Sequence, residues 1–498
     1  MLALKPFVEA LLYVPLRSVD AQAVMDKLRI RIVTQDEVNL EGDVEEETVV
    51  DAANEEILCY DLSKRGYIGV PRTYGIEKLG ISKFINLTTF KRPRPELFVR
   101  KIRPRDKAQQ DFMNELCVLV RSPKPVDIVA NARTGTGKTI TALYVIENAI
   151  QAPTLITVPT TYLLNQWRSR IRGMMGDAWF EQYVGHIQQN KMDYDGRLIV
   201  LGVAASLARR DYPRALRQYF SAIIFDEWHS IGTPSMGRIL ARYPASVRIG
   251  LTATNRRDAL LKVCTLHLGK PRAVSKQEVE RPTVFVVPYR KTLPRTMSYP
   301  SENYMTSLLA RFKDRNDLLC RIIADGYQRG MNSVGLSDRT DQLQVLIHLL
   351  VRDYGVAEED IGLLCGQYKD HRTGKKIKMK QAEKDRVAGT CKIIATTWGQ
   401  FATGADIDRL DMGVELTPRS NVRQGLGRVL RILAGKPTPE WYSIKDEIMV
   451  YPELAQTASL FAPDNPTLYQ PLLDMAKARE GSFADQRGTV QNISADSF

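Results

Sequence analysis

Residues 132–139, with the sequence ARTGTGKT, have the glycines, lysine and threonine of a phosphate-binding loop. The apolar run 126–130 before them predicts a strand, and residues 140–149 after them predict a helix. Glycines let backbone N–H groups turn toward phosphates without a Cβ clash, and the helix N-terminus adds its dipole. Lys138 would then reach the β- and γ-phosphates of a nucleotide, and Thr139 would place its hydroxyl on Mg²⁺. The alternative is a loop rich in Gly and Thr that ends a strand by chance.

Two adjacent carboxylates, Asp226 and Glu227, follow the apolar run 221–225. An acid at the end of a buried strand can coordinate the Mg²⁺ that bridges phosphates, and a neighbouring acid can orient the attacking water. Two such acids could also belong to an ordinary solvated turn. Because a phosphate loop precedes this pair in the chain, the combination favours the binding and hydrolysis of ATP with Mg²⁺.

The elements that must position these residues alternate between strand-like and helix-like segments, from residue 106 to 269 and again from residue 333. Such alternation is typical of parallel α/β sheets. The strand-like runs are 126–130, 155–158, 198–203, 222–225 and 247–251 in the first series, and 334–336, 361–364, 393–395 and 413–416 in the second. Prolines punctuate residues 270–330, so this stretch is expected to cross between two domains.

The composition indicates a globular protein of two to four domains, with 498 residues of which 44% are hydrophobic. No apolar run reaches the roughly 18 residues of a membrane span. The N-terminal sequence lacks the pattern of a secretory signal. The six cysteines lie far apart and the five histidines are scattered, which argues against a disulfide scaffold or a zinc site. We therefore expect a cytoplasmic protein (in the host cytoplasm if it is viral) without a membrane partner.

The net charge of +13 is unevenly distributed. Residues 36–56 hold ten acidic residues, whereas 91–107 hold eight basic ones and 369–380 hold six. Concentrated positive charge is what a phosphate-bearing partner requires, and an ordinary solvated surface is the alternative. For 369–380, between a predicted strand and a predicted helix, the same two interpretations stay open: a grip on nucleic acid or a solvated loop.

Eight motifs, taken together and in order, resemble those of the superfamily 2 helicases. They are ARTGTGKT (132–139), TVPTTYLLNQW (157–167), Ala-Ser-Leu (205–207), DEWH (226–229), Thr-Ala-Thr (252–254), GLSDR (335–339), TTWGQFATGAD (396–406) and QGLGRVLR (424–431). The resemblance covers about residues 103–431, or roughly two-thirds of the chain. In motif style it is closest to the phage UvsW-type branch-migration helicases, followed by the XPB-like repair helicases.

The resemblance implies two tandem RecA-like P-loop domains that close on ATP, with a small N-terminal accessory domain. The implied segments are 1–100 (accessory), 101–270 (first RecA-like domain), 271–330 (crossing), 331–480 (second RecA-like domain) and 481–498 (a polar tail expected to fray). The accessory domain would grip duplex in this family, although a packing or protein-interaction role fits its sequence nearly as well.

The resemblance also implies roles for the residues of this chain at positions that match the motifs. It implies that Asp226 holds Mg²⁺ with Thr139, that Glu227 is the catalytic carboxylate, and that Arg428 and Arg431 contact the γ-phosphate from the second domain. The implied nucleotide-binding residues are Gln109, Thr134, Gly135, Thr136, Gly137, Lys138, Thr139, Gly404, Asp406 and Gln424. The implied coupling residues are His229, Thr252, Ala253 and Thr254. The implied nucleic-acid contacts are Pro159, Thr160, Ser206, Arg339, Thr397 and Trp398.

Several of these assignments leave alternatives. Gln109 would read adenine, but an exposed glutamine at a helix start is nearly as good an interpretation. Trp228 departs from the small residue usual at its position and is expected to pack. Trp167 is expected in the core because it lies in an apolar helix, whereas Trp398 could either stack on bases or pack inside.

The resulting functional hypothesis is an ATP-dependent DNA helicase or translocase that remodels branched DNA in recombination, repair or replication. The preference for DNA over RNA is implied by the resemblance alone, and RNA stays possible. The rival hypothesis is an ATP-gated nucleic-acid clamp or annealing factor that separates no strands. A small-molecule P-loop kinase is disfavoured, because it would have no use for a second α/β domain ending in Gln-x-x-Gly-Arg-x-x-Arg.

Overall fold

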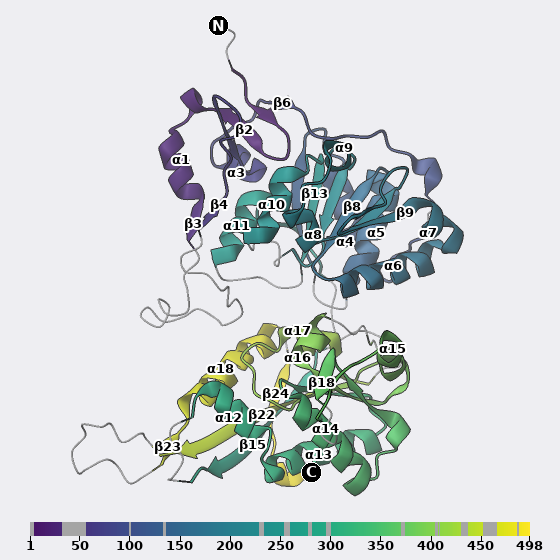
Figure 1. The fold of residues 1–498 in the computed structure, drawn as a ribbon, viewed down its shortest axis with the longest axis vertical. Coiled ribbons are helices and arrows are strands. Elements are labelled where there is room, and N and C mark those ends of the chain that lie inside the picture. The colour runs from purple at the N-terminus through teal and green to yellow at the C-terminus, as the bar shows by residue number, and fades with distance from the viewer. Residues whose placement is uncertain are drawn as a thin grey trace, which may run out of the picture. The chain divides into compact units, whose positions relative to one another are not determined.

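The computed structural model describes most of the chain as two compact units, Met1–Gln277 and Glu278–Phe498. The described residues are 4–31, 56–98, 101–132, 136–228, 234–252, 259–276, 281–294, 300–369, 374–403, 407, 409–429, 437–451, 466–485 and 488–498. Each unit is built around a sheet of mostly parallel strands with helices against it (Figure 1). The predicted fold class, α/β with two tandem parallel sheets, is confirmed.

The first unit holds a sheet in the order β10-β9-β11-β8-β12-β13-β7-β14. Its strands are β7(Val126–Asn131), β8(Thr154–Val158), β9(Val184–Gln188), β10(Lys191–Met192), β11(Ile199–Val203), β12(Ala222–Phe225), β13(Val247–Thr252) and β14(Pro271–Val274). All neighbours are parallel except β9 and β10. The predicted apolar runs fall on these strands, because strands of a parallel sheet are buried on both faces.

The helices of the first unit cover both faces of this sheet. Successive residues of β12, Ile223 and Ile224, belong to two different apolar clusters, one on each face. The helices are α4(Lys107–Val120), α5(Lys138–Val145) continued by the π-helix η3(Ile146–Ile150), α6(Thr161–Met175), α7(Asp177–Tyr183), α8(Ala204–Arg209), α9(Arg214–Arg217), α10(Pro234–Arg242) and α11(Ala259–Leu268).

A smaller sheet at the N-terminus, in the order β5-β2-β1-β6, belongs to the same unit. Its strands are β1(Phe7–Val8), β2(Leu12–Pro15), β5(Tyr67–Val70) and β6(Ile85–Asn86). The other N-terminal elements are η1(Leu16–Ser18), α1(Ala21–Leu28), the pair β3(Arg29–Arg31) and β4(Glu56–Leu58), α3(Arg72–Glu77) and η2(Pro95–Leu97). Most of the acidic segment 36–56 lies outside the described residues.

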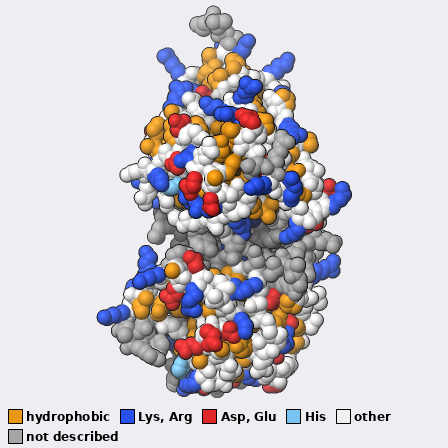
Figure 2. Space-filling model, turned by 90° about the vertical axis from the view of Figure 1, so that its right-hand side faces the viewer, with side chains coloured by type: hydrophobic (Ala, Val, Ile, Leu, Met, Phe, Trp, Pro, Cys, Tyr) orange, Lys and Arg blue, Asp and Glu red, His pale blue; other side chains and the backbone are white. Residues whose placement is uncertain are grey.

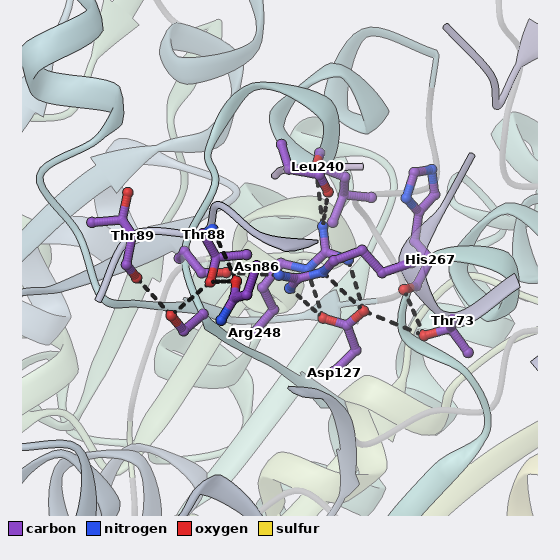
Figure 3. Close-up of polar contacts among 12 residues, drawn as sticks. Thr73, Asn86, Thr88, Thr89, Asp127, Leu240, Arg248 and His267 are labelled. Carbon is purple, nitrogen blue, oxygen red and sulfur yellow. Dashed lines mark hydrogen bonds and ion pairs between the residues drawn. The ribbon is translucent and has the colours of Figure 1, made fainter. Parts of the chain in front are cut away.

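Buried charges join this N-terminal sheet to the main sheet (Figure 3). Asp127 of β7 accepts hydrogen bonds from Arg72 of α3 and from Arg248 of β13, whose Nε and Nη2 lie 2.7 and 2.8 Å from its two oxygens. Arg248 also donates to the backbone oxygen of Ala10 at 3.0 Å. Thr73 Oγ1 donates to the backbone oxygen of His267 at 3.0 Å. The N-terminal sheet is therefore fixed to the main sheet.

The second unit holds a sheet in the order β17-β20-β16-β21-β22-β15-β24, all parallel, with β23 antiparallel to β22. Its strands are β15(Thr283–Thr292), β16(Ser333–Ser337), β17(Ile361–Leu364), β20(Ile393–Thr397), β21(Met412–Glu415), β22(Glu440–Val450), β23(Thr467–Leu468) and β24(Thr489–Asn492). Its helices are α12(Glu302–Leu309), α13(Lys313–Gln328), α14(Thr340–Asp353), η5(Glu358–Asp360), α15(Gln381–Thr390), α16(Trp398–Thr403), α17(Arg423–Val429), α18(Gln470–Asp485) and η6(Ala495–Ser497). A separate hairpin pairs β18(Gln367–Lys369) with β19(Lys376–Lys378).

Two predicted boundaries are wrong. Residues 271–330 do not form a mere crossing, because β14 completes the first sheet, whereas β15 pairs with β22 over ten residues inside the second sheet. Residues 481–498 do not fray as a polar tail, because α18 extends into them and β24 pairs in parallel with β15. In both cases a polar or proline-containing sequence is held by backbone pairing with a strand far away in the chain.

Candidate nucleotide-binding site

The described part of the phosphate loop lies between β7 and α5. Gly137 caps α5 with a left-handed φ of +85°, which favours glycine. A Cβ on Gly137 would lie 2.5 Å from Nε2 of Gln109, so a side chain there would also clash. Thr136 and Thr139 are buried, and Lys138 and Thr139 begin the helix. Thr134 and Gly135 lie outside the described residues.

Gln109 is buried and hydrogen-bonded to this loop, so it is not the exposed helix-start glutamine of the alternative interpretation. Its side chain is 2% exposed. Its Nε2 donates to the backbone oxygen of Thr136 at 2.9 Å, and its Oε1 accepts from the backbone N–H of Arg105 at 2.7 Å. Asp106 positions it by capping α4 through the Gln109 N–H at 2.8 Å. Contact with adenine stays a prediction.

The two carboxylates lie just beyond the carboxyl end of β12. Lys138 Nζ donates to Glu227 Oε1 at 3.1 Å, which brings the phosphate loop and the acidic pair together as the sequence predicts. Glu227 has a left-handed φ of +49°, a strained backbone for a residue with a side chain. Residues held in this way concentrate at functional sites, because the surrounding structure has to impose the conformation.

Asp226 is 7% exposed, and its hydrogen bonds come from neutral donors. The indole Nε1 of Trp167, on α6, donates to Asp226 Oδ2 at 2.8 Å, and the Glu227 backbone N–H donates to Oδ1 at 3.1 Å. Burial and the adjacent Glu227 charge raise the pKa of Asp226, against the effect of Lys138 and the indole. A divalent cation beside Asp226 would favour the charged carboxylate, so the residue is chemically suited to Mg²⁺.

A second side chain of α6 reaches the other predicted magnesium ligand. Arg170 Nη1 donates to Thr139 Oγ1 at 2.9 Å. Sequence reasoning missed this contact and the Trp167–Asp226 bond, although Trp167 is in the core as predicted, at 2% exposed. The available signal was the spacing of three residues between Trp167 and Arg170, which puts both on one helix face.

Residues of the DEWH motif (226–229) and the Thr-Ala-Thr motif (252–254) pack beside this site. Trp228 packs as predicted: it is 3% exposed, and its ring lies 5.3 Å from that of Phe225. A Cβ on Gly250 would lie 2.6 Å from the Trp228 ring, so the glycine makes room for the indole. Thr252 ends β13, and its backbone oxygen accepts from the Ala132 N–H at 2.9 Å, next to the phosphate loop. His229, Ala253 and Thr254 lie outside the described residues.

The nucleotide-contact candidates of the second unit are only partly described. Arg428 is half-buried on α17, with its guanidinium 5.6 Å from the Phe401 ring centre. Gln424 lies on the same helix, where its backbone is described but its side chain is not. Gly404, Asp406 and Arg431 lie outside the described residues.

The nucleic-acid candidates of the first unit lie at one edge of its sheet. Pro159 and Thr160 follow β8, and Ser206 follows β11; these strands are parallel neighbours that end in register. Thr160 caps α6 by accepting the Leu163 N–H at 3.2 Å. Ser206 Oγ accepts the Gln189 N–H at 3.4 Å. All three candidates are half-buried, so the structure brings them together near the surface.

In the second unit, Arg339 follows β16 and Thr397 ends β20, again adjacent parallel strands. Arg339 Nε donates to Ser307 Oγ at 3.1 Å, and Thr397 Oγ1 accepts the Gln400 N–H at 3.3 Å. Trp398 is 3% exposed, with its ring 6.3 Å from the buried Trp441. The base-stacking interpretation of Trp398 is therefore wrong for this structure, because the indole face belongs to the core.

Comparisons with known proteins agree with this arrangement. Residues 101–257 match the family described as type III restriction enzyme, res subunit. The chain is 25% identical to protein L396 of Acanthamoeba polyphaga mimivirus, named as a proposed ATP-dependent RNA helicase, over 73% of this chain and 68% of that protein. It is 22% identical to transcript termination protein A18 of vaccinia virus (strain Ankara), over 65% of this chain and 67% of that protein.

Solved structures also align with much of the chain. Dbp5 of S. cerevisiae, bound to RNA and ADP BeF3, aligns with 82% of this chain and 97% of its own, at 13% identity and a TM-score of 0.50. T4 UvsW aligns over 95% of both chains, at 16% identity and a TM-score of 0.34. No helix in the described part of the chain is long and apolar enough to cross a membrane. The ordered motifs, the two parallel α/β sheets, the match over residues 101–257 and the viral relatives together make the chain similar to the helicases of superfamily 2.

Proposed function

We propose that the chain binds and hydrolyses ATP with Mg²⁺ and uses the cycle to translocate along nucleic acid. The observation that carries this proposal is the Lys138–Glu227 contact at 3.1 Å, beside a buried Asp226. Lys138 would neutralise the terminal phosphates, Thr139 and Asp226 would hold Mg²⁺, and Glu227 would orient water. Bound Mg²⁺ would supply charge neutralisation of the phosphates.

Arg428 and Arg431 would complete the site from the second unit. Their positive charges would stabilise the transferring phosphoryl group only when the units close, which makes hydrolysis depend on closure. Arg428→Ala is expected to lower turnover by roughly 10³-fold, the scale of an arginine finger, while ATP binding largely survives. Loss of binding as severe as in Lys138→Ala would contradict this role for Arg428.

The nucleic-acid surface is proposed at the carboxyl edges of the two sheets, where Thr160, Ser206, Arg339 and Thr397 lie. Hydroxyls, backbone N–H groups and a guanidinium suit contacts with phosphates rather than with base edges. On the face drawn in Figure 2, Lys and Arg side chains are spread over both units and interspersed with acidic ones. We therefore propose recognition of nucleic-acid structure rather than of sequence.

The substrate that we propose is branched or forked DNA, handled in recombination, repair or replication. Transcribed RNA is a second candidate, favoured by the names of the two viral relatives. A panel of matched forked DNA, forked RNA and DNA–RNA hybrids, assayed for ATPase stimulation and strand separation, decides between them. Stimulation by RNA alone would overturn the DNA proposal.

The same panel tests the rival clamp or annealing function. Stimulated ATP hydrolysis without strand separation on any substrate would favour the clamp. The controls are Lys138→Ala and Glu227→Gln, which should remove turnover while the protein stays folded. Near wild-type hydrolysis in either folded variant would overturn the ATPase proposal itself. A cytoplasmic location, in the host cell if the protein is viral, is proposed with this function.

A further inference from the structure

Residues 88–94, which we call the edge segment, run along the amino edge of the main sheet in the first unit. Three backbone N–H groups of the segment donate to residues that precede β13, β12 and β8, which are consecutive strands of this sheet. The bonds join Thr89 to the backbone oxygen of Pro244, Lys91 to Ser221 Oγ and Arg94 to the backbone oxygen of Gln151, at 2.6, 2.6 and 2.7 Å respectively. The edge segment is therefore fixed across the amino ends of these strands.

This anchored backbone holds a large aromatic side chain in solvent. Phe90 is 69% exposed, whereas the backbones of Thr89 and Lys91 on either side of it are hydrogen-bonded to the sheet edge. Ser246 adds to the anchor, because its Oγ donates to the backbone oxygen of Thr89 at 2.7 Å and lies 2.9 Å from Thr88 Oγ1 (Figure 3). An exposed aromatic ring on a fixed backbone is suited to contact a partner, because little further order has to be gained on binding.

The same segment is positively charged. Residues 88–96 hold three basic residues, Lys91, Arg92 and Arg94, and one acidic residue, Glu96, and so carry a net charge of +2. Arg94 Nε lies 3.0 Å from Glu96 Oε1, and a hydrogen bond from the Glu96 backbone N–H, together with Arg94 and Arg92, lowers the pKa of Glu96. Within the part of the chain that the structure describes, neither Lys91 nor Arg92 forms an ion pair with a carboxylate, and both are exposed. The charge of Glu96 thus leaves a positive excess on this segment.

An aromatic ring beside exposed basic side chains has the chemistry of a site for single-stranded nucleic acid. Unpaired bases stack on aromatic rings, and lysine and arginine bind the phosphates that link them. A base inside a duplex is already stacked on its neighbours, so it offers no free face to Phe90. An acidic protein surface matches the charges of Lys91 and Arg92 alone, whereas unpaired bases with their phosphates match the ring and the charges together.

The edge segment lies at the opposite edge of the sheet from the proposed nucleic-acid contacts of the first unit. Thr160 and Ser206 follow the carboxyl ends of β8 and β11, whereas the edge segment crosses amino ends. Strand β8 has five residues, which separate the two edges by roughly 16 Å at about 3.3 Å per residue. Two strands of a branched substrate can thus be held at once, one at each edge.

We propose that the edge segment binds the second single-stranded arm of a branched nucleic acid, with Phe90 stacking on a base and with Lys91 and Arg92 contacting phosphates. This inference rests on the proposed function, and it says how the protein distinguishes a branched substrate from a simple one. It also assigns a role to basic residues of the segment 91–107, which lie outside the eight motifs.

The test compares two forks that share one duplex and one single-stranded arm and that differ only in the presence of a second unpaired arm. Both forks are made in DNA and in RNA, and their affinities are measured without nucleotide. The wild type should bind the two-armed fork about fivefold to a hundredfold more tightly, which is the scale of one stacked base. Phe90→Ala should remove this preference and leave binding of the one-armed fork unchanged. The double change Lys91→Ala and Arg92→Ala should reduce the preference, and on the two-armed fork it should lower the dependence of log K on log salt by about 0.7 per lost phosphate contact.

Matched controls remove the same groups elsewhere in the first unit. Val118→Ala is the control for Phe90→Ala, because Val118 is 70% exposed on α4. The double change Lys27→Ala and Lys78→Ala is the control for charge, because both are exposed lysines of the N-terminal region. Thermal unfolding checks that each variant is folded. Both controls should keep the preference for the two-armed fork, and its loss in either control would show that the edge segment is not its source.

The outcomes separate this inference from the proposed function. Equal affinity of the wild type for the two forks, or a preference that Phe90→Ala retains, would overturn the inference alone. Equal weakening of both forks by Phe90→Ala would also overturn it, because the edge segment would then hold the same strand as the carboxyl edge. ATP hydrolysis and strand separation on the one-armed fork should stay at wild-type levels in Phe90→Ala. If the wild type binds neither fork, the proposed function is wrong and the inference falls with it.

Discussion

Two buried carboxylates of the same sheet, Asp127 and Asp226, are held in opposite ways. Asp127 lies near the start of β7 and accepts hydrogen bonds from both Arg72 and Arg248. Burial would raise its pKa, but the two arginine charges lower it to about 2. Its negative charge is therefore matched inside the fold, and the carboxylate joins the N-terminal sheet to the main sheet.

Asp226 lies beyond the carboxyl end of β12, where its hydrogen bonds come from the Trp167 indole and a backbone N–H. Burial and the neighbouring Glu227 raise its pKa. The charge of Asp127 is thus balanced by two bonded arginines within the protein, whereas Asp226, bonded to neutral donors beside a like charge, is chemically suited to a cation. The position of Asp226 supports the same distinction, because ligands of parallel α/β folds bind at the carboxyl ends of the strands.

The largest expected effect is catalytic. Asp226→Asn keeps the shape of the side chain and removes the charge that Mg²⁺ needs, so ATP turnover should fall by about 10³-fold or more. The unfolding free energy should stay within about 1 kcal/mol of the wild type, because burying a poorly matched charge is itself costly. Steady-state hydrolysis and urea unfolding measure the two quantities. A loss of several kcal/mol in unfolding free energy would show that Asp226 is needed for stability, as is expected of Asp127.

The next effect is on stability. Asp127→Asn leaves Arg72 and Arg248 buried without their counter-charge, which should lower the unfolding free energy by about 3–5 kcal/mol. Turnover per folded molecule should change little, because the phosphate loop lies at the other end of β7. Asp177→Asn is the matched control, since the Asp177 side chain is 84% exposed and its removal should be nearly neutral. Equal stability of the two variants in urea unfolding would contradict the structural role of Asp127.

The third expected effect is a pH dependence of the unfolding free energy, which arises where the N-terminal sheet contacts the main sheet. Burial and Arg248 lower the pKa of His267 to about 3, so between pH 6.5 and 3 the unfolded chain binds a proton that the folded chain does not. The unfolding free energy should therefore fall as pH drops through this window, by up to about 1.4 kcal/mol per pH unit. Below pH 4, Asp127 adds to the loss, because its carboxylate stays ionised in the fold while the unfolded chain is protonated.

Unfolding free energies measured from pH 7 to pH 4 test this sign. His267→Gln should flatten the dependence, while substitution of the exposed His348, a histidine of the second unit, should not. An unchanged slope in His267→Gln would show that the buried imidazole is not the group that titrates.

The smallest expected effect is at the surface, on the hairpin of β18 and β19. Lys376 and Lys378 are exposed on β19, and alternate residues of a strand point to the same face. If this hairpin grips nucleic acid, changing both to Ala should reduce the dependence of log K on log salt by about 0.9 per lost phosphate contact. Binding of one forked duplex at several salt concentrations measures it, with hydrolysis in the absence of nucleic acid as the control. Identical slopes and affinities would make the hairpin a solvated edge.

The parts of the site that are local in the chain can be recognised from the amino-acid sequence. Residues 132–139 and the pair at 226–227 are recognisable because glycines, a lysine and two acids must follow buried strands at fixed positions. The apolar runs also predicted the central strands of both sheets, since strands buried on both faces leave a continuous hydrophobic signal. Lys138 and Glu227 meet as expected, because the carboxyl ends of parallel strands share one edge of the sheet.

The contacts that join distant segments could not be predicted from the sequence. The bond from Trp167 to Asp226, the approach of Arg170 to Thr139 and the two arginines on Asp127 depend on how helices and the N-terminal sheet pack on the main sheet. The strand pairing of 271–330 and of the C-terminal segment is equally non-local, because backbone hydrogen bonds can hold a polar sequence in a sheet. Trp398 is a further example of a residue whose place the sequence could not predict. An aromatic residue gives the same sequence signal whether its side chain stacks on a base or packs in a core, and the tertiary structure places this indole in the core.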